Sequence, residues 1–100
     1  MASRNIVAGH LKAVGYESIT ISTTAKKFTD SQIANASRAI ITIEDAQLRY
    51  RYDGANPTSS EGHLVNPLDV IIIKTLTNIK KARFIRKGST DAKIRVTFEA

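Results

Sequence analysis

Apolar and polar residues alternate along most of this chain, and a two-residue period is typical of strands that bury one face. In the segment 16–23, for example, Ile19 and Ile21 alternate with hydroxyl-bearing residues. The run from Val70 to Ile73 is apolar throughout instead, which favours a buried strand. Strands are therefore predicted at 16–23, 38–44, 47–52, 63–65, 69–74, 79–87 and 92–99.

Turn-forming residues indicate how these strands are connected. The short Glu44-Asp45 corner predicts a hairpin of 38–44 with 47–52, and the turn at 88–91 predicts that 79–87 and 92–99 also pair. The stretch 53–62 is rich in Gly, Asn, Pro and Ser and is predicted to be the longest loop. In the segment 28–37, a Thr and a Gln at capping-box spacing predict a short helical turn.

The number of strands and the length of the chain together define the fold class. Six to seven mostly antiparallel strands, without a long amphipathic helix, predict an all-β fold that is a small β-sandwich or barrel. One hundred residues hold one core, so the prediction is an extended N-terminal arm at 1–15 followed by a single β domain at 16–100. Because that core is modest in size, we expect a homo-oligomer.

Composition limits the classes of function. Fifteen Lys and Arg against nine Asp and Glu give a net charge of +6, which suits an acidic protein surface or a nucleic acid as partner. The lack of cysteine excludes disulfides, thiolate catalysis and cysteine-ligated zinc. The longest apolar run is too short to cross a bilayer and the N-terminus lacks a secretory pattern, so we expect no membrane partner.

Few residues are candidates for catalysis or metal binding. His63 follows the loop 53–62, and Asp53 and Asp69 flank it, so an acid, a base and a metal ligand are formally present. Their spacing matches neither a metal site nor a nucleophilic triad, and a His63 that hydrogen-bonds loop backbone is the better interpretation. His10 has still less support, and the glycines form no nucleotide-binding motif. We therefore predict no enzyme, no cofactor and no bound metal.

Arginines and tyrosines alternate near the middle of the chain. Period-two geometry places Arg49 and Arg51 on the face opposite Tyr50 and Tyr52, which predicts exposed arginines and core tyrosines rather than a joint base-stacking platform. Farther on, the stretch 74–95 holds eight basic residues and a single acid. This basic surface is either a solvated face or a contact with acidic protein or phosphate.

Six short motifs stand between residues 49 and 98: Arg49-Tyr50-Arg51-Tyr52-Asp53-Gly54, Pro57-Thr58, Gly62-His63-Leu64, Phe84-Ile85-Arg86, Gly88-Ser89-Thr90-Asp91-Ala92 and Val96-Thr97-Phe98. With the strands around them, over about residues 16–99, they resemble small proteins encoded among the virion structural genes of tailed bacteriophages. The resemblance implies a β-rich virion component that decorates or cements the capsid or sits at the head–tail junction, usually as a symmetric oligomer. It does not imply catalysis.

The resemblance and the residue pattern together lead to one expected function. We expect a capsid decoration or cement protein that is made in the host cytoplasm, binds the major capsid protein in the virion and stabilises the shell, with a trimer favoured. The arm is expected to reach over a neighbouring subunit. The basic residues expected to meet acidic patches on the shell are Arg49, Arg51, Arg83, Arg86 and Lys87. The alternatives are a head–tail connector or tail component and, less expected, a nucleic-acid-binding β-barrel.

Overall fold

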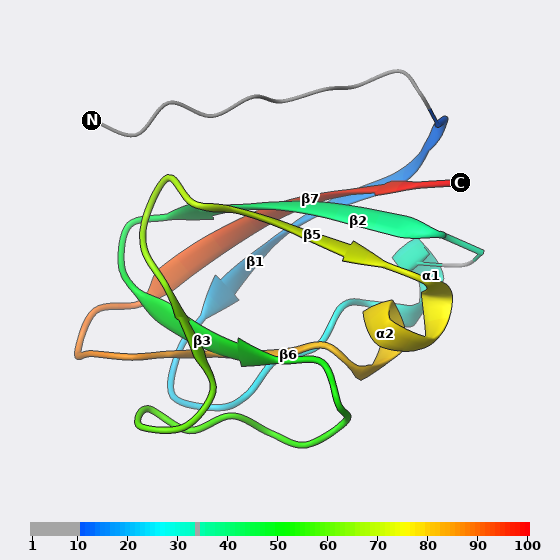
Figure 1. The fold of residues 1–100 in the computed structure, drawn as a ribbon. Coiled ribbons are helices and arrows are strands. Elements are labelled where there is room, and N and C mark those ends of the chain that lie inside the picture. Colours follow the sequence, from blue (N-terminus) through cyan, green and yellow to red (C-terminus); the bar gives the residue numbers. More distant parts are fainter. Residues whose placement is uncertain (1–10, 34) are drawn as a thin grey trace.

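Two antiparallel β-sheets packed face to face make up the protein in a computed structural model that describes residues 11–33 and 35–100 (Figure 1). The larger sheet has the strand order β1-β7-β2-β5 and the smaller one β4-β3-β6. The elements are β1 (Ala13–Ile21), α1 (Asp30–Ile33), β2 (Arg38–Glu44), β3 (Leu48–Arg51), β4 (His63–Val65), β5 (Val70–Lys74), α2 (Leu76–Lys81), β6 (Arg83–Arg86) and β7 (Ala92–Glu99). The predicted all-β fold with about seven strands is confirmed.

The interior lies between the two sheets, as the period-two pattern requires. Along β7, Ile94, Val96 and Phe98 are fully buried and alternate with half-buried polar residues. Phe28 reaches the same interior from the segment between β1 and α1, and its ring contacts Phe98 edge-on and Phe84 at a tilt, with centroids 5.1 and 5.3 Å apart. These three phenylalanines hold the two sheets together.

Both predicted hairpins are wrong. β2 pairs with β5 and β7 in the larger sheet, whereas β3 pairs with β4 and β6 in the smaller one. The Glu44-Asp45 corner therefore carries the chain from one sheet to the other, with Asp45 at a φ of 77°. The 88–91 turn makes the same kind of crossing from β6 to β7, at the same end of the sandwich (Figure 1). Alternation predicts which face of a strand is buried, but it does not select the strand's partner.

Two element boundaries also differ from the prediction. β1 begins at Ala13, so residues 13–15 of the predicted arm are strand, and residues 1–10 of that arm lie outside the described residues. The first part of the predicted strand 79–87 is helical instead, because α2 continues to Lys81 and buries Ile79 against the core. The preceding Thr75 is of a type favoured at the N-cap, but with a φ of 80° its side chain forms no cap hydrogen bond.

The predicted helical turn in 28–37 is confirmed as α1, although its cap is not the expected one. The backbone N–H and the hydroxyl of Thr29 both donate to the Glu17 carboxylate of β1, each at 2.8 Å. The carbonyl of Thr29 accepts the N–H groups of Gln32 and Ile33. Glu17, which is distant in sequence, therefore accepts the Thr29 N–H in place of the predicted Gln32.

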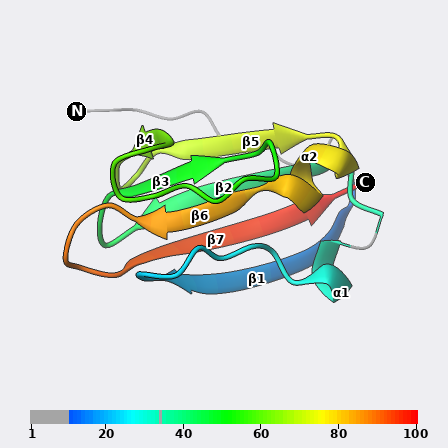
Figure 2. The ribbon, with the colours of Figure 1, turned by 90° about the horizontal axis from the view of Figure 1, so that it is seen from below.

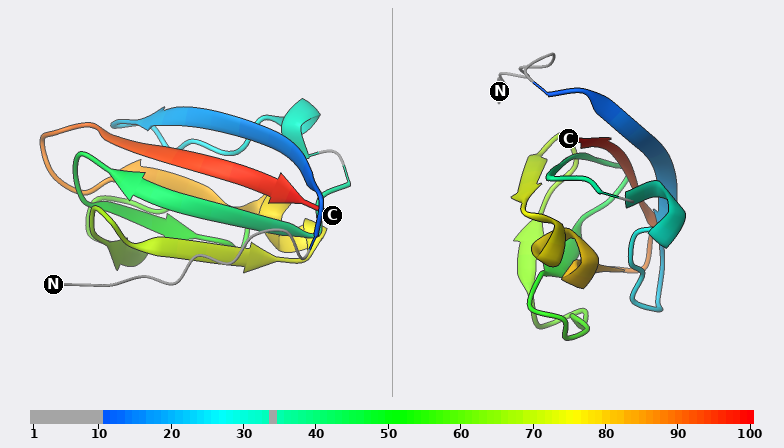
Figure 3. Two further views of the ribbon diagram at one scale, coloured as in Figure 1. Left: turned by 90° about the horizontal axis from the view of Figure 1, so that it is seen from above. Right: turned by 90° about the vertical axis from the view of Figure 1, so that its right-hand side faces the viewer.

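The two long sides of the sandwich differ. On one side, Lys26 exchanges two backbone hydrogen bonds with Phe84, and Ser22 accepts one from Arg86, so the chain after β1 covers the β6 edge. On the other side, β4 and β5 are the edge strands of their sheets and do not pair with each other. The strand order across the sandwich is visible from below and from above (Figures 2 and 3). This second side leaves room for a cleft.

Candidate binding surfaces

The five basic residues predicted to form an interface do not gather into one patch. Arg49 and Arg51 of β3 and Arg83 of β6 point to the outer face of the smaller sheet, whereas Arg86 lies in register with the buried Leu48. Each guanidinium has a partner within the chain: Arg49 the carbonyls of Ser59 and Gly62, Arg51 the carboxylate of Asp53, Arg83 the carbonyls of Lys80 and Ala82, and Arg86 the carboxylate of Asp91. Within the described residues, only Lys87 of the five has no side-chain partner. These guanidiniums are therefore already engaged within the chain, and their interface role stays a prediction.

Arg49 shows what such an arginine does. Its Nε and Nη1 donate to the carbonyls of Ser59 and Gly62 at 3.0 and 2.9 Å, so one side chain holds the far end of the loop 53–62 against β3. Gly62 has a φ of 130°, and an added Cβ would lie 3.3 Å from the Arg49 Cβ, so the chain passes very close to the strand here. The turn-rich loop is thus tied to the sheet.

We expect Arg49→Ala to lower the free energy of unfolding by about 1–3 kcal/mol, because two carbonyls lose a charged donor. The loop amides should exchange faster in hydrogen exchange, while the core strands keep their order of protection. Arg51→Ala is the matched control, since its partner Asp53 is an exposed carboxylate and the change should affect stability little. Equal loss of stability in both variants would contradict the loop-holding role of Arg49.

Asp91 connects the β6–β7 crossing to the core strands. The Ser22 hydroxyl and the Arg86 guanidinium lower the pKa of the Asp91 carboxyl below its usual 3.8. The charged form is therefore favoured in the folded state, and its stabilising contribution is complete above the unfolded pKa and is lost as the pH falls through the folded one.

Because the ionised Asp91 carboxylate stabilises the folded state, we predict that Asp91→Asn reduces the dependence of stability on pH in the acid range. Urea midpoints measured between about pH 5 and pH 2 should fall less steeply for the variant than for the wild type. At neutral pH the variant should be the less stable of the two. Parallel curves over this range would show that the ion pair with Arg86 does not contribute.

The outer face of the larger sheet carries an apolar row. In the strand register, Tyr16 of β1 lies beside Thr97 of β7, Thr97 beside Ile40 of β2, and Ile40 beside Ile72 of β5. Tyr16 and Ile72, at the two ends of the row, are 55% and 54% exposed. We call this surface, with the neighbouring Val14 and Val70, the outer apolar row. It crosses all four strands on the face that does not contact the smaller sheet.

Charged residues border the outer apolar row. Arg95 donates to Glu44 and to the Ser18 hydroxyl, both at 2.9 Å, and Arg38 pairs with the buried Glu99. The Ser18 hydroxyl and the Arg95 guanidinium also lower the pKa of the Tyr16 phenol, so this side chain belongs to the network. Within the described residues, Lys74 and Lys93 on the same face form no ion pair, which leaves the rim net positive.

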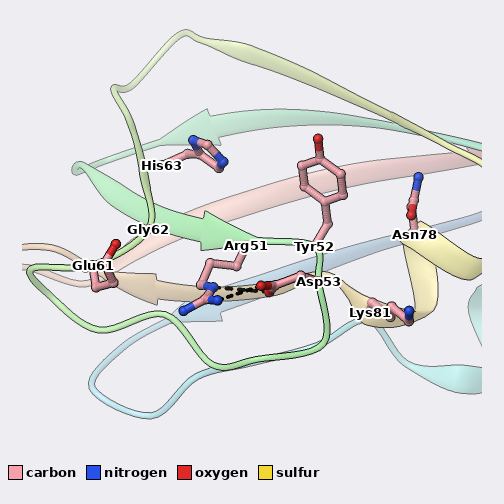
Figure 4. Close-up of a pocket in the computed structure, with 8 residues that line it drawn as sticks. All are labelled: Arg51, Tyr52, Asp53, Glu61, Gly62, His63, Asn78 and Lys81. Atoms are coloured by element: carbon pink, nitrogen blue, oxygen red, sulfur yellow. Dashed lines mark hydrogen bonds and ion pairs between the residues drawn. The ribbon is translucent and has the colours of Figure 1, made fainter.

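A second candidate surface is an open cleft on the side where β4 and β5 are edge strands. Two adjoining hollows of about 740 and 300 Å³ share Tyr52 and Asn78 in their walls. The rings of Tyr50, Tyr52 and His63 lie beside one another, with centroids 5.3–6.5 Å apart. Figure 4 shows Tyr52, His63 and Asn78 projecting to one side of β3, while Arg51 and Asp53 pair on the other. We call this site the edge cleft.

The candidate acid–base residues do not converge in the cleft. His63 packs against the rings of Tyr50 and Tyr52 instead of hydrogen-bonding loop backbone, Asp53 pairs with Arg51, and Asp69 accepts the Asn66 N–H at 2.7 Å. In residues 11–33 and 35–100, no three His, Asp or Glu side chains gather as a metal site would require. His10 lies outside the described residues.

No family model, curated protein or solved structure matched this chain. Among the described residues, no helix is long and apolar enough to cross a membrane. The outer apolar row and the edge cleft are the two candidate binding surfaces of the described residues.

Proposed function

We propose that this chain is a non-catalytic virion structural protein, a capsid decoration or cement protein that binds the assembled shell through its outer apolar row. The observation that carries the proposal is the row itself. The solvated face of an antiparallel sheet is normally polar, yet here Tyr16, Ile40 and Ile72 align on three of the four strands, with Thr97 of β7 between Tyr16 and Ile40. An exposed apolar strip bordered by charge has the anatomy of a protein–protein interface.

The charge of the rim indicates the kind of partner. Because Glu44 and Glu99 are occupied by arginines, the charges left over are those of Lys74 and Lys93. A complementary surface has an apolar centre with carboxylates at its edges, and we assign it to the major capsid protein in the assembled shell. Subunits of this chain would then sit side by side on the shell, and a trimer is the favoured oligomer.

Binding to the assembled form alone explains how a cement protein stabilises a shell. A protein that binds the assembled shell and not its separated subunits shifts the equilibrium towards assembly by mass action. The chain made in the host cytoplasm would therefore act when it reaches the capsid. No catalytic group is required.

The test is a mass measurement of the purified chain in solution, followed by co-sedimentation with capsids that lack it. We expect a trimer, or a monomer that binds capsids stoichiometrically, and decorated capsids that resist heating better than bare ones. Capsids of equal heat resistance with and without the protein would refute the cement role. A closed ring that ignores the capsid surface would favour a connector or tail component, and binding to DNA alone would favour a nucleic-acid-binding protein.

A further inference from the structure

The edge cleft has the shape and lining of a small-molecule site. Its two hollows fall within the range of about 300–1,000 Å³ that is usual for ligand pockets. Ile71 and Ile73 of β5 line the smaller hollow, and both are nearly fully buried. Tyr50 anchors the opposite wall, because its ring stacks on the core residue Phe84 with centroids 6.0 Å apart. The aromatic wall is therefore held rigidly by the core.

Tyr52 and His63 extend this wall into solvent. Tyr52 is 45% exposed, and its ring lies nearly parallel to those of Tyr50 and His63, at interplanar angles of 19° and 28° and with centroids 6.3 and 6.5 Å apart. Three aromatic rings thus line one wall of the cleft in succession. A ring ligand that presents C–H groups on one face would meet the electron-rich faces of these rings.

The polar ends of the aromatic wall have no partners in the part of the chain that the structure describes. Among the described residues, the hydroxyls of Tyr50 and Tyr52 and the ring nitrogens of His63 form no hydrogen bond. Asn78 donates its amide N–H to the Lys74 carbonyl at 3.2 Å, which leaves its oxygen free to accept. Hydroxyl, imidazole and amide groups supply both donors and acceptors at the rim of an apolar platform.

The charges around the cleft disfavour a polyanion. Arg51 is neutralised by Asp53. The lining of the larger hollow also contains one further acid, Glu61, and one further base, Lys81, so its formal charges cancel. A nucleic acid that stacks bases on aromatic rings also needs a basic groove along its phosphates, and two carboxylates in the same hollow work against that. A neutral ring bearing hydroxyl groups fits the lining better.

We propose that the edge cleft is a carbohydrate-binding site that stacks a neutral sugar ring on Tyr52 and His63 and hydrogen-bonds its hydroxyls through Asn78 and the tyrosine phenols. The two surfaces adjoin, because Ile72 and Lys74 at one end of the outer apolar row also line the smaller hollow of the cleft. The larger hollow, which Tyr52 and His63 line, contains no residue of the row.

The experiment is a titration of the ¹⁵N-labelled full chain with four neutral hexasaccharides: cellohexaose, chitohexaose, laminarihexaose and maltohexaose. At concentrations up to about 10 mM, at least one should cause saturable shifts that are confined to the amides of the cleft residues. Tyr52→Ala should weaken that binding at least about tenfold, and Tyr52→Phe should weaken it less, because the ring remains and only the hydroxyl is lost.

Tyr16→Ala is the matched control, since it removes an exposed tyrosine of similar accessibility from the outer apolar row. It should leave the saccharide titration unchanged while it weakens shell binding, and Tyr52→Ala should do the reverse. The proposal is overturned if none of the four saccharides shifts the cleft amides, or if the shifts persist in Tyr52→Ala. Cleft shifts with a twelve-residue oligothymidine, and with no saccharide, would overturn it in favour of a nucleic-acid site.

Discussion

Replacing Phe28 with alanine should destabilise the protein more than any other single change considered, by about 3–5 kcal/mol. Phe28 is 2% exposed, and its ring fills the space between Phe84 of the smaller sheet and Phe98 of the larger one. Truncation removes two aromatic contacts and leaves a cavity where the sheets meet. Urea unfolding at neutral pH measures the loss, and it should appear in the midpoint with little change in the slope.

A control separates the loss of packing from the loss of the ring. Phe28→Leu keeps most of the apolar volume and should recover well over half of the lost stability. If Phe28→Ala were as stable as the wild type, the segment between β1 and α1 would not be part of the core. Phe84 and Phe98 would then pack between the sheets without a contribution from Phe28.

Ile72→Asp should weaken binding to capsids at least about thirtyfold while it leaves the fold intact, because burying an unpaired charge in an apolar contact costs more than about 2 kcal/mol. Ile72 is 54% exposed on an edge strand, so the isolated chain should tolerate the change. The measurement is co-sedimentation of the variant with bare capsids over a range of concentrations. Circular dichroism and the urea midpoint verify the fold.

Leu64→Asp is the matched control for this experiment. Leu64 is 43% exposed on the edge strand β4, opposite Arg49 on the outer face of the smaller sheet. It is therefore an exposed apolar residue on the other side of the molecule, and its replacement should leave capsid binding unchanged. Equal loss in both variants would contradict docking through the outer apolar row, and so would a loss in Leu64→Asp alone.

The positions of the strands and the faces they bury could be predicted from alternation, because that pattern is local. Tyr50 packs beside Phe84 while Arg49 faces outward, as the two-residue period indicated. The prediction of a core tyrosine at Tyr52 is wrong, because β3 ends at Arg51 and Tyr52 is 45% exposed beyond it. The pairing could not be predicted in the same way, since short corners usually join neighbours in one sheet. Here the corners at Asp45 and at 88–91 join different sheets, and only the packing of the whole core selects that arrangement.

The candidate sites were harder to predict for a related reason. The five basic residues were conspicuous in the sequence, but four of them carry guanidiniums that the chain itself neutralises or hydrogen-bonds. The outer apolar row combines strands that are far apart in sequence and exists only through their register. The sequence did contain one signal for the outer apolar row. Ile40 and Ile72 are apolar at positions that alternation places on the outer face of the sheet, where polar residues are expected.

The place of β7 between β1 and β2 bears on when this protein can fold. Of the strands in residues 11–33 and 35–100, β7 is the last to be synthesised, yet it joins β1, the first of them, to the rest of the larger sheet. Residues 12 and 100 exchange a pair of backbone hydrogen bonds, so this sheet brings together parts of the chain made at widely different times. The larger sheet, and with it the outer apolar row, therefore cannot form on the ribosome until Glu99 has emerged, and its adhesive surface is absent from every shorter nascent chain.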